Sequence, residues 1–426
     1  MIPFATPHSR ATLGWIALGL AWGAVLALAV AGTAIGDEWV HWAQIQRFVG
    51  GDFRVFDQWL TNIPGYHWLL TAMLAPFGIQ ELSWVRAITA LMTLACGWVF
   101  FRIRSHLHPG DAQRATAQFF FLPTMFVYGY MAYTDVPALL FLLGAVLATL
   151  RDRHGLSALW LIGSMAIRQN NVLWVGFLAL YAAWPMLEPA LRSLLPGAAR
   201  WTAACWRDWI KALLLRVWPY MVAVACFCAY WAWNGSIAYS TAQSQNAHPD
   251  FRLDIGNPVF MLAIAALLFP LQITAGWGRL TVRGMDWRGA WVWLLPVLAF
   301  GLYALFFKVH HPFNFILPGN VRNQWLQQVA EGGVAWWFFG AVATWAFCGL
   351  LFQRYVMRQG WLWLPFSLLF VAASWMIETR YTIVPFVLFL ALRRPEGVWA
   401  ERVTLAGWSV LSGWLAWNVF DHRFML

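Results

Sequence analysis

Long apolar runs recur along almost the whole chain and are separated by short segments that are rich in arginine. A helix needs about 20 apolar residues to cross a bilayer, and many of these runs approach that length. With the basic segments as boundaries, the pattern predicts an all-α polytopic membrane protein with about 13 spans in a single domain over residues 1–426. We expect the spans at residues 12–34, 83–103, 115–132, 136–150, 156–167, 171–186, 217–233, 257–275, 289–307, 333–352, 360–376, 380–392 and 403–420.

The segment after the first apolar run does not fit a simple crossing. Residues 64–78 form an apolar run of about 15 residues, which is short for a span, and no basic cluster follows it. We therefore place this run in the membrane interface. The pattern predicts a first outward loop over residues 35–82 that carries short interfacial helices.

A second irregularity lies between two basic connections. The apolar runs 156–167 and 171–186 are both short, and the polar sequence Arg168-Gln169-Asn170-Asn171 separates them. An arginine at membrane depth is costly unless it faces a partner or a water-filled cavity. The sequence therefore predicts two short helices that meet at a polar vestibule.

Composition and charge support this class and its topology. The chain is 61% hydrophobic and 11% charged, whereas soluble domains carry about 25% charged residues. The net charge of +10 comes from arginines on alternate connections, the positive-inside pattern, so it indicates topology rather than a nucleic-acid partner. We expect a cytoplasmic N-terminus, with residues 12–34 as a retained first helix. The basic connections hold Arg10, Arg102, Arg104, Arg114, Arg151, Arg153, Arg192, Arg200, Arg207, Lys211, Arg216, Arg279, Arg283, Arg288, Arg354, Arg358, Arg393, Arg394 and Arg402.

Several kinds of chemistry lack their sequence signals. The five cysteines fall in predicted spans or basic connections, without the spacing of a zinc site. The chain has no P-loop, no G-x-G-x-x-G and no G-x-S-x-G motif. We therefore expect no disulfide, no metal and no cofactor, and neither nucleotide hydrolysis nor serine-hydrolase chemistry.

Acidic residues collect on the predicted outward side, where 11 of the 18 Asp and Glu residues lie. The densest polar group, with Asp37 and Glu38 at its start, follows the first span directly. Helical spacing would set Asp37, His41 and Gln44 on one face, at positions i, i+4 and i+7. This group is the first candidate for the chemistry of the protein.

Short polar motifs continue in a fixed order from this group to about residue 390. They are Asp37-Glu38-x-x-His41-x-x-Gln44-x-Gln46, Thr61-x-x-Pro64-Gly65, Pro123-Thr124, Tyr133-Thr134-Asp135, Arg168-Gln169-Asn170-Asn171, Asn234-Gly235, His311-Pro312-Phe313 and Glu378-x-Arg380-Tyr381. In this series the chain resembles the eukaryotic α-1,2-glucosyltransferases that add the last glucose to the dolichol-linked oligosaccharide. These are membrane enzymes of the GT-C class, so the resemblance implies a GT-C-type transmembrane helix bundle.

Two departures from the family fall in the predicted outward loops 234–257 and 308–332. After Asn234-Gly235 the family carries Gly-Asp and two histidines, whereas this chain continues Ser-Ile-Ala-Tyr, with His248 as the one candidate. The family's Ala-Asp-Asn-Arg-His element is replaced by residues 317–323, which lack the acid and the histidine. These departures concern the acceptor more than the donor.

The resemblance implies transfer of a hexose, glucose in the family, from a polyprenyl-phosphate donor to a hydroxyl with inversion at the anomeric carbon. Inversion by direct displacement needs one carboxylate base, and we assign this role to Asp37, with Glu38 as alternative or orienting neighbour. Guanidinium groups match phosphate oxygens, so we expect Arg168 and Arg380, with Gln169, at the donor phosphate. Further substrate-binding candidates are His41, Gln44, Tyr133, Asp135, His311, Arg322, Glu378 and Tyr381. The acceptor is a glycan, a lipid or a protein.

Plainer interpretations exist for several of these residues. Asp37 and Glu38 could be a solvated helix start, where the helix dipole favours acids. Asp135 could cap the next helix, and Arg168 could form a structural ion pair with Asp135 or Glu378. The pair Asp37-Glu38 with His41 is the one conceivable metal site that the sequence offers.

Two other functions remain open at this point. Broken helices with polar residues are also a transporter signature, so a transporter or flippase of lipid-linked sugars is the alternative. A ligase or polymerase with a diphosphate-linked donor would place its chemistry in loop 308–332. Composition and the absence of retrieval signals indicate a bacterial source, which predicts an inner-membrane protein whose site faces the periplasm.

Overall fold

The computed structural model describes residues 7–56, 60–194, 202–240, 249–250, 252–286, 289–309, 311, 314 and 324–423. Within this part the chain is helical, and its one β-contact is an isolated bridge between Tyr355 and Arg393. The helices are α1 (Pro7–Ala31), α2 (Glu38–Val49), α3 (Gly65–Leu74), α4 (Leu82–Leu107), α5 (Ala112–Phe120), α6 (Pro123–Phe126), α7 (Asp135–Leu150), α8 (His154–Ile167), α9 (Val172–Ser193), α10 (Ala203–Asn234), α12 (Gly256–Leu268), α13 (Pro270–Gly284), α14 (Leu294–Phe306), α15 (Gln324–Ala330), α16 (Gly333–Leu351), α17 (Trp363–Ala372), α18 (Ile383–Leu392) and α19 (Val398–Phe420).

The prediction of an all-helical polytopic membrane fold is confirmed, but the count of 13 spans is not. By length and composition, four helical segments of the described chain can each cross a membrane: Leu82–Leu107, Gln169–Ser193, Ala203–Asn234 and Gly333–Leu351. The number rises to six if each of two sharply bent helix pairs forms one span.

Both bent pairs lie where the sequence predicted straight crossings. The predicted span 115–132 is divided, because α5 ends at Phe120 and a short segment from Pro123 to Tyr130 bends by 114° before α7. The predicted span 257–275 bends by 101° between α12 and α13. Proline begins α13 at Pro270, and a proline cannot donate the backbone hydrogen bond that a continuous helix requires.

The region around Arg168 is partly as predicted. Helix α8 ends at Ile167, the 3₁₀ helix η4 (Gln169–Asn171) follows, and α9 begins at Val172. The expectation that both runs are too short to cross is wrong for the second, because the segment Gln169–Ser193 has 25 residues. The connection between the predicted spans 171–186 and 217–233 is correspondingly shorter, since α9 continues to Ser193 and α10 begins at Ala203.

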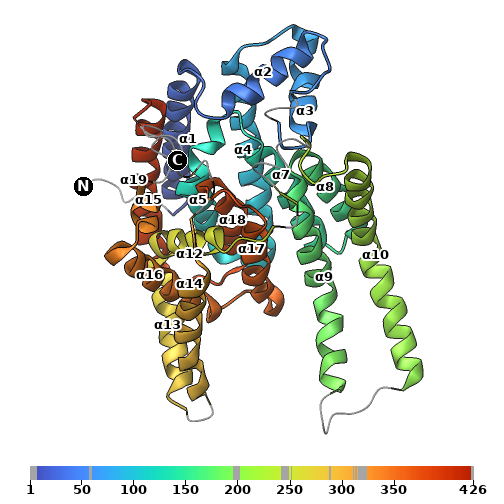
Figure 1. Cartoon of the computed structure of the whole chain (residues 1–426), viewed down its shortest axis with the longest axis vertical. Helices are drawn as coiled ribbons and strands as arrows, with labels where there is room; N and C mark the ends of the chain where they lie inside the picture. Colours follow the sequence, from blue (N-terminus) through green and yellow to red (C-terminus); the bar gives the residue numbers. More distant parts are fainter. Residues whose placement is uncertain are drawn as a thin grey trace.

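The two ends of the molecule differ in chemistry. Figure 1 shows α2 and α3 at one end, and the C-terminal ends of α9 and α13 at the other. The short helices α2 and α3 lie within residues 35–82, where the sequence predicted short helices. Arg192 and Arg283 lie in the last turns of α9 and α13, so basic residues mark the end opposite to α2.

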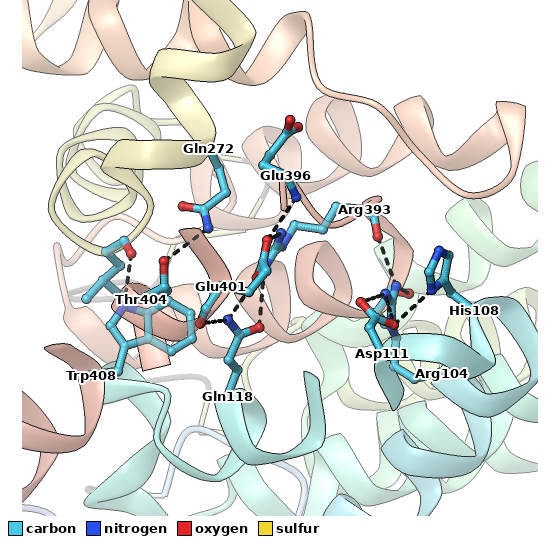
Figure 2. Close-up of polar contacts among 12 residues, drawn as sticks. Arg104, His108, Asp111, Gln118, Gln272, Arg393, Glu396, Glu401, Thr404 and Trp408 are labelled. Carbon is cyan, nitrogen blue, oxygen red and sulfur yellow. Dashed lines mark hydrogen bonds and ion pairs between the residues drawn. The ribbon is translucent and has the colours of Figure 1, made fainter. Parts of the chain in front are cut away.

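A buried polar network joins helices that are far apart in the sequence (Figure 2). The guanidinium of Arg393, after α18, donates to both carboxylate oxygens of Glu401 in α19 at 2.6 and 2.5 Å. Gln118 of α5 donates to Glu401 at 2.8 Å, and Arg104 of α4 donates to Asp111 and to the carbonyl of Arg393. Two arginines of the predicted basic connections are therefore buried structural groups.

Candidate active site

The polar group at the start of α2 divides into an accessible and a buried carboxylate. Asp37 immediately precedes the helix, and its side chain is 37% exposed, whereas the Glu38 side chain is fully buried. A carboxylate oxygen of Asp37 lies 3.1 Å from a terminal guanidinium nitrogen of Arg380, and the Asp37 amide donates to the Tyr133 hydroxyl at 2.9 Å. The position of Asp37 is thus fixed by residues from α2, η8 (Thr379–Thr382) and the segment before α7.

Glu38 is held by hydrogen bonds on both of its carboxylate oxygens. The amides of Ile35 and Ala132 donate to it at 2.9 and 2.7 Å, and Arg86 of α4 forms a buried ion pair with it. Arg86 also donates to the carbonyls of Gly32 and Thr33. Burial and full pairing favour a role for Glu38 in positioning the start of α2 over contact with substrate.

Arg380 is clamped between two acids that come from different parts of the site. Its Nε donates to Glu378 at 2.7 Å, while one of its terminal nitrogens lies 3.1 Å from a carboxylate oxygen of Asp37. The ring of Tyr133 lies 5.2 Å from the guanidinium carbon, within the range of a cation–π contact. Three side chains, Glu378, Asp37 and Tyr133, therefore fix the orientation of this arginine.

Two asparagines that the sequence analysis missed hold the segment that leads to Arg380. Asn257 donates to the carbonyls of Ser374 and Met376 at 2.6 and 2.7 Å, and it accepts from the Glu378 amide at 3.2 Å. Asn314 exchanges hydrogen bonds with the backbone of Ile377 at 3.0 and 3.2 Å. For Asn257 the sequence did contain a signal, the Asn-Pro step at the start of α12. A side-chain amide in an apolar run indicates a buried group that requires hydrogen-bond partners.

Arg168 forms a second charged centre next to Arg380. It makes a buried ion pair with Asp135 at the first residue of α7, one of the two partners considered for it from the sequence. The Tyr381 ring lies 5.6 Å from the Arg168 guanidinium carbon and 5.7 Å from that of Arg380. Tyr381 therefore contacts both candidate phosphate-binding arginines.

The Thr-x-x-Pro-Gly motif brings α3 against this centre. Gln169 donates to the Thr61 carbonyl at 2.8 Å and accepts from the Ile63 amide at 3.4 Å. A side chain at Gly65 would collide with the carbonyl of Ala166, so a glycine is required where α3 begins against the end of α8. Gln169 therefore positions the backbone of this motif.

A cavity of about 290 Å³ lies beside the two arginines. Its polar part includes Arg168, Gln169 and Arg380, and its apolar part includes Leu173 of α9 and Phe227 of α10. Ser374, Trp375, Asp250 and Arg252 also contribute to its lining. A cavity with cationic and apolar walls suits a ligand that joins a phosphate to a hydrocarbon chain.

His41 and Gln44 lie on the buried face of α2. A ring nitrogen of His41 is 3.0 Å from one of His67 in α3, and both rings are buried. Burial lowers the pKa of His41 from its usual value to about 4, and burial also holds the pKa of His67 well below its usual range. Gln44 accepts from the Phe56 amide at 2.8 Å and donates to the Arg54 carbonyl, so it fixes the loop after α2.

Some of the remaining candidates lie within the described residues and others lie outside them. His311 is buried, and its ring packs edge-on against Trp375 at 4.6 Å between centroids. Arg322 and His248 lie outside the described residues, as do parts of the two segments 234–257 and 308–332 that were predicted as outward loops. Among the described residues, no group of three His, Cys, Asp or Glu side chains is placed to hold a metal ion.

The fold and site define a polytopic helical membrane protein whose charged centre lies beside a partly apolar cavity. Comparison with known proteins gives the family. The model of the DIE2/ALG10 family matches residues 32–391, and the chain belongs to this family.

The curated relatives that it matches are each named Dol-P-Glc:Glc(2)Man(9)GlcNAc(2)-PP-Dol alpha-1,2-glucosyltransferase. The chain is 31% identical to the Arabidopsis thaliana protein over 34% of this chain and 32% of that protein. It is 24% identical to a Homo sapiens protein over 50% and 52% of the two chains, so the match spans about half of that relative. With the Drosophila melanogaster protein it shares 24% identity over 91% of this chain and 90% of the relative. No solved structure matches the chain significantly.

Proposed function

We propose that the protein is an inverting glucosyltransferase that moves glucose from a polyprenyl-phosphate donor to the hydroxyl of a glycan or lipid acceptor. The relatives named above are glucosyltransferases with a dolichyl-phosphate-glucose donor, and the family model covers most of the chain. One observation carries the proposal within this chain: Asp37, which is more exposed than Glu38, Asp135 and Glu378, contacts Arg380, which lines the cavity together with Arg168.

The reaction is a single displacement. The acceptor hydroxyl gives its proton to the Asp37 carboxylate while its oxygen forms a bond to the anomeric carbon of glucose. The bond from that carbon to the phosphate oxygen breaks, and the electron pair remains on the phosphate. Arg168 and Arg380 stabilise the phosphate charge, so the leaving group needs no acid catalyst.

The shared position of Arg380 implies an order of events. Arg380 binds Asp37 at 3.1 Å, so the guanidinium that would stabilise the donor phosphate is shared with this carboxylate. A donor phosphate in the cavity competes for the same guanidinium and weakens its contact with Asp37. Donor binding thus frees the Asp37 carboxylate to accept a hydrogen bond from the acceptor hydroxyl, and we expect donor to bind before acceptor in the productive sequence.

We place the site on the outer face of a bacterial inner membrane, with the N-terminus in the cytoplasm. The basic ends of α9 and α13 lie opposite to α2, which supports this orientation by the positive-inside pattern. A donor with a polyprenyl chain would then keep its chain in the bilayer, while its phosphate reaches the arginines.

The decisive experiment is the substitution Asp37→Asn in the purified full-length protein. We expect loss of glucose transfer by about 10²–10⁴-fold, which is the usual contribution of a general base, with donor retention unchanged. The measurement uses a short-chain polyprenyl-phosphate-[¹⁴C]glucose, with transfer and bound donor counted separately.

Asp52→Asn is the matched control, because Asp52 lies in the same outward region, is 35% exposed and also pairs with arginines. Full transfer by the Asp37→Asn protein would overturn the assignment of Asp37 as base.

The same assay separates a transferase from a transporter of lipid-linked sugars, to which sharply bent helices also point. A transferase releases polyprenyl phosphate when an acceptor extract is added, and the release stops when the acceptor is removed. A transporter moves the labelled lipid across a proteoliposome membrane and leaves its sugar–phosphate bond intact.

A further inference from the structure

A second cavity, of about 660 Å³, lies between α13 and the segment after α16. We call it the basic groove, and its lining includes Gly278, Arg279, Arg283, Phe352, Gln353 and Arg354. It is distinct from the candidate active site, because α18 separates the two. Arg380 precedes α18, whereas the amide of Arg394, just beyond the other end of the helix, donates to the Arg354 carbonyl at 2.8 Å.

Close helix packing forms one side of the groove. A side chain at Gly276 of α13 would collide with the Gly349 carbonyl of α16, so the two helix backbones touch there. Gly278 lies in the same helix, but a side chain built on it would meet no atom within 4 Å. The glycine therefore leaves open space in the groove that nothing in the described chain occupies.

Of the three arginines that line the groove, one is paired with a carboxylate of the described chain and two are not. Arg279 is held by an ion pair with Glu396 and by the Phe352 carbonyl at 3.1 Å, so its charge is compensated. Within the part of the chain that the structure describes, neither Arg283 nor Arg354 forms an ion pair, and both side chains are exposed. Among the described residues no carboxylate lines the groove, so these two guanidinium groups give it a net positive charge.

Aromatic residues indicate the depth of the groove in the bilayer. The guanidinium of Arg283 lies 5.7 Å from the ring centroid of Trp291, which is 53% exposed. Exposed tryptophans collect at the boundary between the hydrocarbon and the headgroups. The neighbouring apolar side chains Val282 and Leu351, 73% and 41% exposed, line the same groove and would face lipid.

We propose that the basic groove binds the headgroup of an anionic phospholipid of the surrounding bilayer. The phosphate would be held by Arg283 and Arg354, whose forked donors match phosphate oxygens. One acyl chain would lie along Val282 and Leu351, and the open space at Gly278 would admit the glycerol backbone. Basic pockets between transmembrane helices on the cytoplasmic side are suited to such lipids.

Native mass spectrometry of the full-length protein tests this proposal. The protein is mixed with equal amounts of phosphatidylglycerol and phosphatidylcholine, and the lipids retained after mild collisional activation are counted. We expect preferential retention of phosphatidylglycerol by the wild type. The double substitution Arg283→Gln/Arg354→Gln should weaken that binding about 30-fold, since each arginine near a lipid phosphate contributes about fivefold.

Two further variants distinguish the groove from general surface charge. Gly278→Leu keeps both arginines and fills the open space, so we expect it to lose phosphatidylglycerol as well. The control Arg151→Gln/Arg153→Gln removes two exposed arginines at the turn between α7 and α8 and should retain the lipid. Thermal unfolding in phosphatidylcholine nanodiscs verifies that each variant is folded.

Equal retention of the two lipids by the wild type would overturn the proposal. It would also fail if the control loses as much lipid as the groove variant, or if folded Gly278→Leu binds as the wild type does. A final arm adds inorganic phosphate alone. If phosphate binds the groove without lipid and displaces phosphatidylglycerol completely, the ligand is a soluble phosphate and the lipid assignment is wrong.

Discussion

Arg168 and Arg380 are neighbours at the cavity, but their partners give them different expected roles. Arg380 faces the base candidate Asp37, whereas Arg168 is paired with Asp135 on the side of α7. Substrate phosphate can therefore replace a carboxylate at either arginine. The exposed fraction of each pair decides which is easier to open, and Asp37 at 37% is far more exposed than Asp135 at 6%.

The substitution Arg168→Ala should weaken use of the donor more than use of the acceptor. A hydrogen bond to a charged group contributes about 1.5–3 kcal/mol, so we expect KM for the donor to rise about 10- to 100-fold. Arg168→Lys keeps the charge but loses the fork, and it should recover part of the effect. Unchanged donor dependence in Arg168→Ala would show that the arginine only pairs with Asp135.

The lowered pKa of His41 predicts that the stability of the folded protein depends on pH. Its pKa in the folded protein is about 4, below its usual value of 6.5, so the unfolded chain binds more protons between these values. Stability should therefore fall as pH is lowered from 6.5 to 4, by up to about 3 kcal/mol at the lower limit. His67, in contact with His41, has a lowered pKa as well and acts in the same direction.

Thermal unfolding in detergent at a series of pH values measures this effect. His41→Gln cannot be protonated in this range, so the fall in unfolding temperature should be shallower than in the wild type. If the unfolding temperature of the variant falls with pH as steeply as that of the wild type, His41 is not the source of the pH dependence.

At the scale of elements, the ion pair between Glu38 and Arg86 ties α2 to α4 and to the end of α1. Both side chains are fully buried, and removing one partner of a buried pair leaves an uncompensated charge that costs about 3–5 kcal/mol. Arg86→Met should therefore lower the unfolding temperature strongly. The double variant Glu38→Gln/Arg86→Met should be more stable than Arg86→Met alone, because no charge then remains buried.

Transfer by the double variant, measured below its unfolding temperature, separates positioning from catalysis. If Glu38 only positions α2, the folded double variant keeps measurable transfer and the pH profile of the wild type. Complete loss of transfer by a folded protein would place Glu38 in the reaction itself.

The elements show what the sequence could and could not predict. The helices at 135–150 and 154–167 follow the predicted spans closely, because hydrophobic length and flanking arginines define them. The segment from Phe121 to Ala132 was predicted as part of a straight span, yet its bend depends on contacts such as that of Glu38 with the Ala132 amide. Apolar composition cannot reveal such a bend, because a buried bent segment is as hydrophobic as a straight one.

The site shows the same division. Motif order identified Asp37, Arg168 and Arg380 without giving their mutual arrangement, and these assignments stay predictions until tested. Asn257 and Asn314 were missed because the sequence does not reveal their partners, which are backbone carbonyls and amides of residues 374–378. Contacts of this kind follow from the tertiary fold alone.

At the scale of the whole molecule, the proposed orientation predicts which surfaces reagents can reach. Cys205 is exposed at the start of α10, at the basic end, and Phe53 is 58% exposed after α2. In a Cys226→Ser/Cys228→Ser background, a membrane-impermeant maleimide applied to spheroplasts should label Phe53→Cys and spare Cys205. Inverted membrane vesicles should give the opposite pattern. Labelling of Cys205 in spheroplasts would show that the proposed orientation is wrong.

The contact between Asp37 and Arg380 joins residues near the two ends of the chain. During synthesis the first of these emerges from the ribosome long before the second, so the charged centre cannot assemble until α18 has been inserted. Until then Asp37 lacks the cation that lies beside it in the finished protein. A nascent or prematurely terminated chain would therefore be inert towards lipid-linked sugars, and competence for transfer would arise in a late step of membrane insertion.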